Sequence, residues 1–111
     1  MLIINFSHPI VKNAALERVT DEALDQIEII DIPVHLDLSK SLRPQVVEIV
    51  YRLSLDSYFP DIDAIRLPGF AVAAVLVVEA FRVRGNIPNI IRFDRAGGAV
   101  TRFDAVEIIR L

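Results

Sequence analysis

The 111-residue sequence contains no cysteine, which excludes disulfide bonds, thiolate nucleophiles and cysteine-ligated zinc. Basic residues are also scarce: the net charge is −3 and the pI is about 5.3, which argues against a protein that coats duplex nucleic acid. The longest apolar run, residues 70–78, is far shorter than the ~20 residues that span a bilayer. Met1 leads directly into apolar residues without a basic region, so we expect no signal peptide, no membrane association and a cytoplasmic protein.

Several familiar catalytic motifs are missing as well. The first apolar run is followed by Ser7-His8-Pro9 and not by a glycine-rich dinucleotide fingerprint, and no phosphate loop ending in GK[ST] exists. No serine is flanked by glycines, as a nucleophile elbow requires. His8 and His35 have no second histidine at helical spacing. We therefore expect no metal site and no cofactor.

Hydrophobic residues, in contrast, make up 53% of the chain. This content, with a small net charge, excludes disorder and predicts one domain over residues 1–111. A domain of this size exposes a large share of its surface, so part of the apolar excess is expected to be hidden in a partner. The composition thus favours a homodimer.

The hydrophobic pattern predicts alternating strands and helices. The expected elements are strand 2–6, helix 14–26, strand 27–32, a helix capped by Ser41 with an apolar face at 46–53, loop 56–63, strand 64–67, helix 70–84 ended by Gly85, strand 89–93, turn 96–99 and strand 105–111. Strands 2–6, 27–32 and 89–93 are nearly all apolar, as expected of strands covered on both faces. The order predicts a Rossmann-like three-layer α/β sandwich, mostly parallel, with a C-terminal antiparallel hairpin.

Three loops follow the predicted parallel strands, and right-handed crossovers place all three at one edge of the sheet. Ligands of open α/β sheets bind at that edge, where the strand order reverses. The candidate ligand-binding residues in or beside these loops are Asn5, Ser7, His8, Pro68, Gly69, Phe70, Arg92, Asp94 and Arg95.

Ser7-His8-Pro9 carries the most distinctive chemistry, because a histidine can donate to phosphate or act as a general acid and base near neutral pH. The alternative is a turn histidine with its ring in water. Asn5 lies inside an apolar strand and needs hydrogen-bond partners, and its amide could donate at the same edge. We favour a functional role for this cluster, and His35 and Asp37 are weaker candidates.

The segment Leu67-Pro68-Gly69-Phe70 lets backbone amides approach a ligand beside a helix N-terminus, although a simple Pro-Gly turn explains it equally well. Arg92 and Arg95 offer paired N–H donors to phosphate, and Asp94 could orient one of them. For Arg92 the slightly favoured alternative is an exposed ion pair of little energetic value.

Three segments together resemble a known family: the opening MLIINFSHP, the central LPGF that leads into an apolar helix, and GNIPNIIRF. They are similar to the small Csx-type CRISPR-associated proteins with a CARF-like Rossmann fold, ancillary members of type III CRISPR loci. The resemblance covers residues 1–93 and implies a homodimer that binds a cyclic oligoadenylate second messenger, cyclic tetra-adenylate above all, in antiviral signalling. Some such proteins only sequester the ring, and others are ring nucleases that cut it.

Cutting such a ring without a metal needs in-line geometry, a base and stabilisation of the phosphorane charge. At this edge of the sheet His8 is the candidate general acid or base, and Ser7, Arg92 and Arg95 are the candidate charge stabilisers. No lysine lies in the three loops, which is a departure that keeps pure binding open. The alternative from another class is a small dimeric α/β interaction subunit, such as a toxin–antitoxin component, without a nucleotide ligand.

Overall fold

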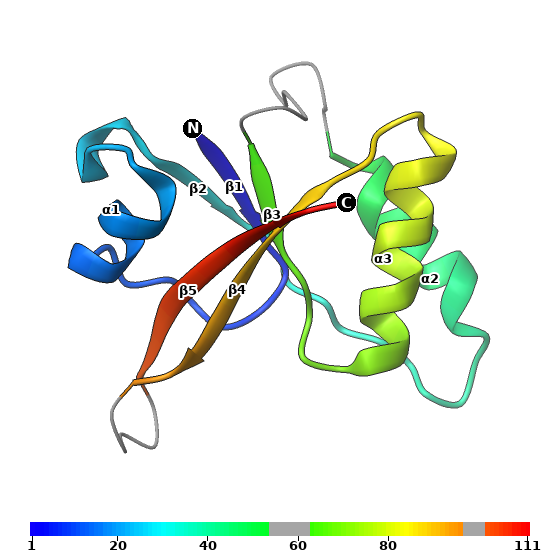
Figure 1. The fold of residues 1–111 in the computed structure, drawn as a ribbon. Helices are drawn as coiled ribbons and strands as arrows, with labels where there is room; N and C mark the ends of the chain where they lie inside the picture. Colours follow the sequence, from blue (N-terminus) through cyan, green and yellow to red (C-terminus); the bar gives the residue numbers. More distant parts are fainter. Residues whose placement is uncertain (54–62, 97–101) are drawn as a thin grey trace.

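A five-stranded sheet with helices on both faces forms the protein in this computed structural model, which describes residues 1–53, 63–96 and 102–111 (Figure 1). The elements are β1 (Leu2–Asn5), α1 (Ala14–Thr20), the 3-10 turn η1 (Leu24–Gln26), β2 (Glu28–Asp31), α2 (Leu42–Tyr51), β3 (Ala64–Arg66), α3 (Ala71–Val83), β4 (Asn89–Arg95) and β5 (Phe103–Arg110). Residues 56–62 of the predicted loop and 97–99 of the predicted turn lie outside the described residues.

The strand order is β2-β1-β3-β4-β5. The first four strands are parallel, and β5 runs antiparallel to β4 with a register irregularity between Arg92 and Phe93. From β1 the chain proceeds outward to β2, and from β3 it proceeds in the opposite direction to β4. The order therefore reverses between β1 and β3, as in a doubly wound sheet. The predicted Rossmann-like fold with a C-terminal hairpin is confirmed.

Two hydrophobic cores lie on the two faces of the sheet because side chains alternate along each strand. Leu2 and Ile4 of β1 pack with the buried residues of α2 and α3, while Ile3 packs in the core that contains Leu16 of α1. The second core also includes Ala105 of β5. Figure 1 shows the resulting three layers, with α1 on one side of the sheet and α2 and α3 on the other.

The first helix is shorter than the predicted 14–26. It ends at Thr20, whose hydroxyl donates to the carbonyl of Leu16 at 2.8 Å, and Asp21 follows in the left-handed region with φ of 55°. The N–H of Asp21 closes the last turn by donating to the carbonyl of Glu17. Local polar bonds thus stop the helix, although the apolar periodicity continues into η1.

Two further expectations about the N-terminal half need correction. The strand β2 lies at the edge of the sheet, and its two faces are covered only in part: half-buried Ile30 packs against the core that contains α2 and α3, and half-buried Ile29 packs against the core that contains Leu16. Ser41 occupies the N-cap position of α2, but its hydroxyl caps no backbone N–H. The side chain of Gln45 donates instead to the Ser41 carbonyl at 2.9 Å.

The helix α3 ends as the sequence predicts. Gly85 has φ of +83°, its N–H donates to Arg82, and the N–H of Asn86 donates to Phe81. These two bonds form the Schellman arrangement, in which glycine is favoured because a Cβ atom is strained at positive φ. In the part of the chain that the structure describes, no helix is long and apolar enough to cross a membrane.

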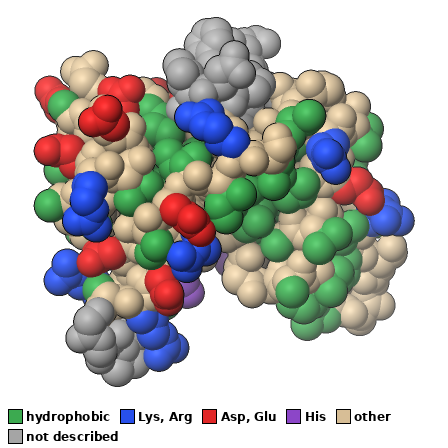
Figure 2. All heavy atoms as spheres, viewed as in Figure 1, with side chains coloured by type: hydrophobic (Ala, Val, Ile, Leu, Met, Phe, Trp, Pro, Cys, Tyr) green, Lys and Arg blue, Asp and Glu red, His purple; other side chains and the backbone are tan. Residues whose placement is uncertain are grey.

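The apolar surface of α3 is only partly covered. Val75 is 67% exposed and Val83 is 71% exposed, and Val72 is also exposed. Figure 2 shows hydrophobic side chains gathered over this helix, whereas charged side chains concentrate over α1 and the β4–β5 hairpin. We call these three valines the α3 patch. A sequence that is apolar nearly all round predicts cover on every face, and residues 1–53, 63–96 and 102–111 do not supply it.

Leu16→Ala should lower the free energy of unfolding by about 2–5 kcal/mol, because it leaves a cavity in the core against α1. Leu16 is fully buried, whereas Leu38 is 72% exposed. The matched variant Leu38→Ala should change the free energy of unfolding by less than about 0.5 kcal/mol. Urea unfolding followed by circular dichroism measures both, and equal losses would contradict the assigned core.

Candidate functional site

Two adjoining hollows lie at the carboxyl edge of the sheet, where β1 and β3 end and the strand order reverses. Both are lined by Ser7, His8 and Gly69. The first, of about 490 Å³, is also lined by Arg66, Leu67, Ile90, Ile91, Arg92, Phe93, Phe103 and Ile109. The second, of about 470 Å³, is also lined by Phe6, Pro9, Pro33, Val34, His35, Leu36, Pro68 and Phe70. We call the two hollows together the switch-point cleft.

Asn5, the last residue of β1, is fully buried and holds the loop that follows it. Its amide nitrogen donates to the His8 carbonyl at 2.8 Å and to a carboxylate oxygen of Asp31 at 2.8 Å, and its amide oxygen accepts from the Ser7 N–H at 3.1 Å. Parallel pairing of β1 with β2 places Asp31 opposite Asn5. Because both amide hydrogens are used inside the protein, Asn5 positions the loop and does not offer them to a ligand.

Arg66 approaches the same loop from β3. One of its guanidinium nitrogens donates to the His8 carbonyl at 2.8 Å. The guanidinium carbon lies 4.3 Å from the ring centre of Phe93 and 5.8 Å from that of Phe103. Burial lowers the pKa of the Arg66 guanidinium from its ordinary value. The His8 carbonyl thus accepts from both Asn5 and Arg66, which ties the loop to β1 and β3 together.

The imidazole of His8 packs against the hairpin. Its ring lies 6.2 Å from that of Phe103, with an angle of 16° between the planes. His8 itself is exposed and lines both hollows. The ring therefore has one face on an aromatic partner while the residue remains accessible from the cleft.

Gly69 stands before α3 without a steric reason to be glycine. A Cβ atom placed on Gly69 meets nothing within 4 Å, and Gly69 is not at positive φ. Phe70, the N-cap residue of α3, makes no side-chain cap hydrogen bond. The fold therefore does not demand glycine in the predicted turn, and the first N–H groups of a 13-residue helix lie beside the cleft.

The three charged candidates on β4 differ in their contacts. Arg92 lines the first hollow, but its Nε donates to Glu107 at 2.9 Å and it also lies 3.7 Å from Asp94. Asp94 and Arg95 are exposed farther along the hairpin and do not line the two hollows. The structural alternative for Arg92, an exposed ion pair, therefore describes its contacts in this structure.

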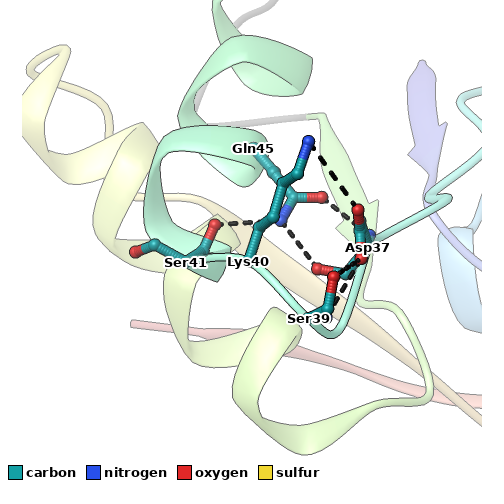
Figure 3. Close-up of polar contacts among 5 residues, drawn as sticks. All are labelled: Asp37, Ser39, Lys40, Ser41 and Gln45. Atoms are coloured by element: carbon teal, nitrogen blue, oxygen red, sulfur yellow. Dashed lines mark hydrogen bonds and ion pairs between the residues drawn. The ribbon is translucent and has the colours of Figure 1, made fainter.

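Asp37, a weaker candidate, belongs to a local network that leads into α2 (Figure 3). Its carboxylate accepts from the hydroxyl and N–H of Ser39 and lies 3.9 Å from the Lys40 ammonium. The hydrogen bonds from Ser39 hold the pKa of the Asp37 carboxyl below its ordinary value. Gln45 of α2 accepts from the Asp37 N–H and donates to its carbonyl. These contacts explain Asp37 as a loop residue, whereas His35 lines the second hollow.

Arg66, Phe93 and Phe103 line the cleft although the sequence patterns did not single them out. A charged residue at the end of a short apolar strand is a visible signal for Arg66, since such a charge needs partners when it is buried. No comparable signal marks the two phenylalanines. Their place follows from the hairpin pairing, which sets Phe103 opposite Arg95 and extends β4 past the rest of the sheet.

Comparisons of the chain with protein-family models, with curated proteins and with solved structures found no match. These comparisons therefore name no ligand for the switch-point cleft.

Asn5→Ala should lower the free energy of unfolding by about 1–3 kcal/mol. The variant removes the hydrogen-bond acceptor of the Ser7 N–H and the donor to a carboxylate oxygen of Asp31. Asn86→Ala is the matched control, since the Asn86 amide makes a weak 3.4 Å bond to the carbonyl of Arg84. Denaturant unfolding compares the two variants. A loss at Asn5 no larger than the loss at Asn86 would contradict the positioning role.

Proposed function

We propose that the protein binds a cyclic oligoadenylate, cyclic tetra-adenylate above all, in the switch-point cleft of a homodimer and thereby sequesters this second messenger of type III CRISPR antiviral signalling. The observation that carries the proposal is the convergence of Ser7, His8 and Gly69 on both hollows at the reversal of strand order. The resemblance of residues 1–93 to small Csx-type CARF-like proteins supplies the identity of the ring.

The donors around the cleft suit phosphodiester groups. Gly69 presents backbone without a side chain, and the uncapped N-terminus of α3 attracts negative charge. The hollows, of about 490 and 470 Å³, are each in the range of small-ligand pockets. Their shared residues make them one continuous surface, as an extended ring of nucleotides requires.

The α3 patch supports a second copy of the chain as the partner. A groove of about 630 Å³ runs along α3, lined by Leu67, Ala74, Val75, Val78, Glu79, Arg82 and Val83. Leu67 also lines the first hollow of the cleft, so the groove and the cleft adjoin. A two-fold contact along α3 would therefore bring two copies of the cleft near one axis. A symmetric ring suits such an isologous arrangement, because each copy offers the same donors.

The residues favour binding over cutting. Among the described cleft residues, the two histidines are the side chains suited to general acid–base work near neutral pH, and only His8 lines both hollows. Arg92, the expected charge stabiliser, is already paired with Glu107. An interaction subunit without a nucleotide ligand is the competing proposal, and the exposed α3 patch is the observation that favours it.

Gly69→Val should weaken the binding of labelled cyclic tetra-adenylate at least about tenfold, because Gly69 lines both hollows and a branched side chain there keeps the ring away from the backbone. The open space around Gly69 means that the free energy of unfolding should change by less than about 0.5 kcal/mol. Equilibrium binding followed by chromatography of the label measures affinity and separates intact from cut ring.

The control for this experiment is Ala23→Val, an exposed alanine that lines neither hollow and has extended backbone at φ of −62° and ψ of 141°. It should bind the ring like the unaltered protein. Unchanged affinity in folded Gly69→Val would remove the turn from the site. An unaltered protein that binds no cyclic oligoadenylate would overturn the proposed function in favour of the interaction subunit.

Val75→Glu should convert a dimer into a monomer at micromolar concentration, because it places a charge in the centre of the α3 patch. Val11→Glu is the matched control, since Val11 is 66% exposed and Val75 is 67% exposed. Multi-angle light scattering after gel filtration gives the mass of each. A monomeric unaltered protein, or a dimer that survives Val75→Glu, would contradict the assigned interface.

A further inference from the structure

Arg66 is a buried cation without a carboxylate partner in the part of the chain that the structure describes. It is 8% exposed. Several other arginines in residues 1–53, 63–96 and 102–111 lie against carboxylates, as Arg43 does with Glu79 and Arg92 with Glu107. Removing a charge from water without a counter-ion is costly. A bound anion in the first hollow, which Arg66 lines, would supply that counter-ion.

The contacts of Arg66 with the described residues fix the guanidinium but leave most of its donors unused. The face of the group packs on Phe93 at 4.3 Å, a distance at which the ring attracts a cation. A guanidinium carries five N–H groups. Among the described residues, the hydrogen-bond acceptor of the Arg66 guanidinium is the His8 carbonyl, which binds one of its terminal nitrogens. A guanidinium held in this way is pre-organised for an oxyanion, because little side-chain freedom remains to be lost on binding.

We propose that Arg66 is a phosphate-binding residue of the switch-point cleft and that it donates paired N–H groups to a phosphodiester of a nucleotide ligand. The inference deepens the proposed function and rests on it for the identity of the ring. The binding of a phosphate group by Arg66 does not depend on which nucleotide carries that group, and free inorganic phosphate could accept the same hydrogen bonds.

The neighbouring rings favour a nucleotide over free phosphate. His8 stacks on Phe103, and Phe103 lies 5.8 Å from the Arg66 guanidinium carbon. The exposed His8 beside the hollow offers a flat surface on which a base can stack. A base and its phosphate would thus meet adjoining groups of one cleft.

The competing explanation is that Arg66 only holds the His8 loop. The chain contains a matched example of that role in Arg84, which donates to the carbonyls of Val50 and Leu53 and lies 5.3 Å from the ring centre of Tyr51. Arg84→Gln is therefore the control for Arg66→Gln. Both variants remove hydrogen bonds to backbone carbonyls, one made by Arg66 and two made by Arg84, together with cation–π contacts, but Arg84 does not line the first hollow.

The test measures binding of three probes by calorimetry at several salt concentrations: cyclic tetra-adenylate, the linear dinucleotide ApA and inorganic phosphate. Arg66→Gln should weaken binding of cyclic tetra-adenylate about tenfold to a hundredfold. In a plot of the logarithm of the binding constant against the logarithm of the salt concentration, the slope should become shallower by about 0.7 for each phosphate group that the variant no longer neutralises. Arg84→Gln should change neither quantity. A stronger effect on ApA than on inorganic phosphate would identify a nucleotide phosphodiester.

Arg66→Lys keeps the positive charge, and this variant replaces Arg66→Gln in the test if Arg66→Gln does not fold. It should still weaken binding severalfold, because an ammonium cannot form the paired, stacked interaction. Folded Arg66 variants with unchanged affinity and salt slope would overturn the inference while leaving the proposed function intact. Arg66-dependent binding of ApA without any binding of cyclic oligoadenylate would overturn the proposed ring and support the phosphate site. If the unaltered protein binds none of the three probes, both the proposed function and the Arg66 phosphate site would be overturned.

Discussion

The carbonyl of His8 is the point on which the candidate site depends. It accepts one hydrogen bond from the buried Asn5 amide and another from the Arg66 guanidinium, each at 2.8 Å. Asn5 also binds Asp31, so a single polar cluster ties the loop after β1 to the ends of β1, β2 and β3. The loop that carries Ser7 and His8 is therefore set by the rigid sheet, as precise recognition of a ligand requires.

The fold was predictable because its signals are local and repeat along the chain. Strands 2–6 and 89–93, the helix ended by Gly85 and the terminal hairpin strand all follow from apolar runs and glycine or proline stops. The predictions that were wrong also concern single elements. Thr20 and Asp21 end α1 through hydrogen bonds that periodicity does not record, and the exposure of β2 depends on its edge position in the sheet.

The candidate site was predictable in its place but not in its parts. Parallel strands force Ser7, His8 and Gly69 to one edge, so their meeting follows from the topology alone. The roles of single side chains depend on contacts between distant segments. Register with Asp31 makes Asn5 a positioning residue, and pairing with Glu107 neutralises Arg92. Arg66 gains its place from Phe93, which only the folded hairpin brings over it.

The most direct measurement is an NMR titration of the ¹⁵N-labelled protein with cyclic tetra-adenylate, with each backbone amide followed by its chemical shift. We expect the largest changes at Ser7, His8 and Gly69, with few changes around α1. Shifts that centre on α1 or on the Asp37–Gln45 network, or no shifts at saturating ligand, would contradict the switch-point cleft as the binding site.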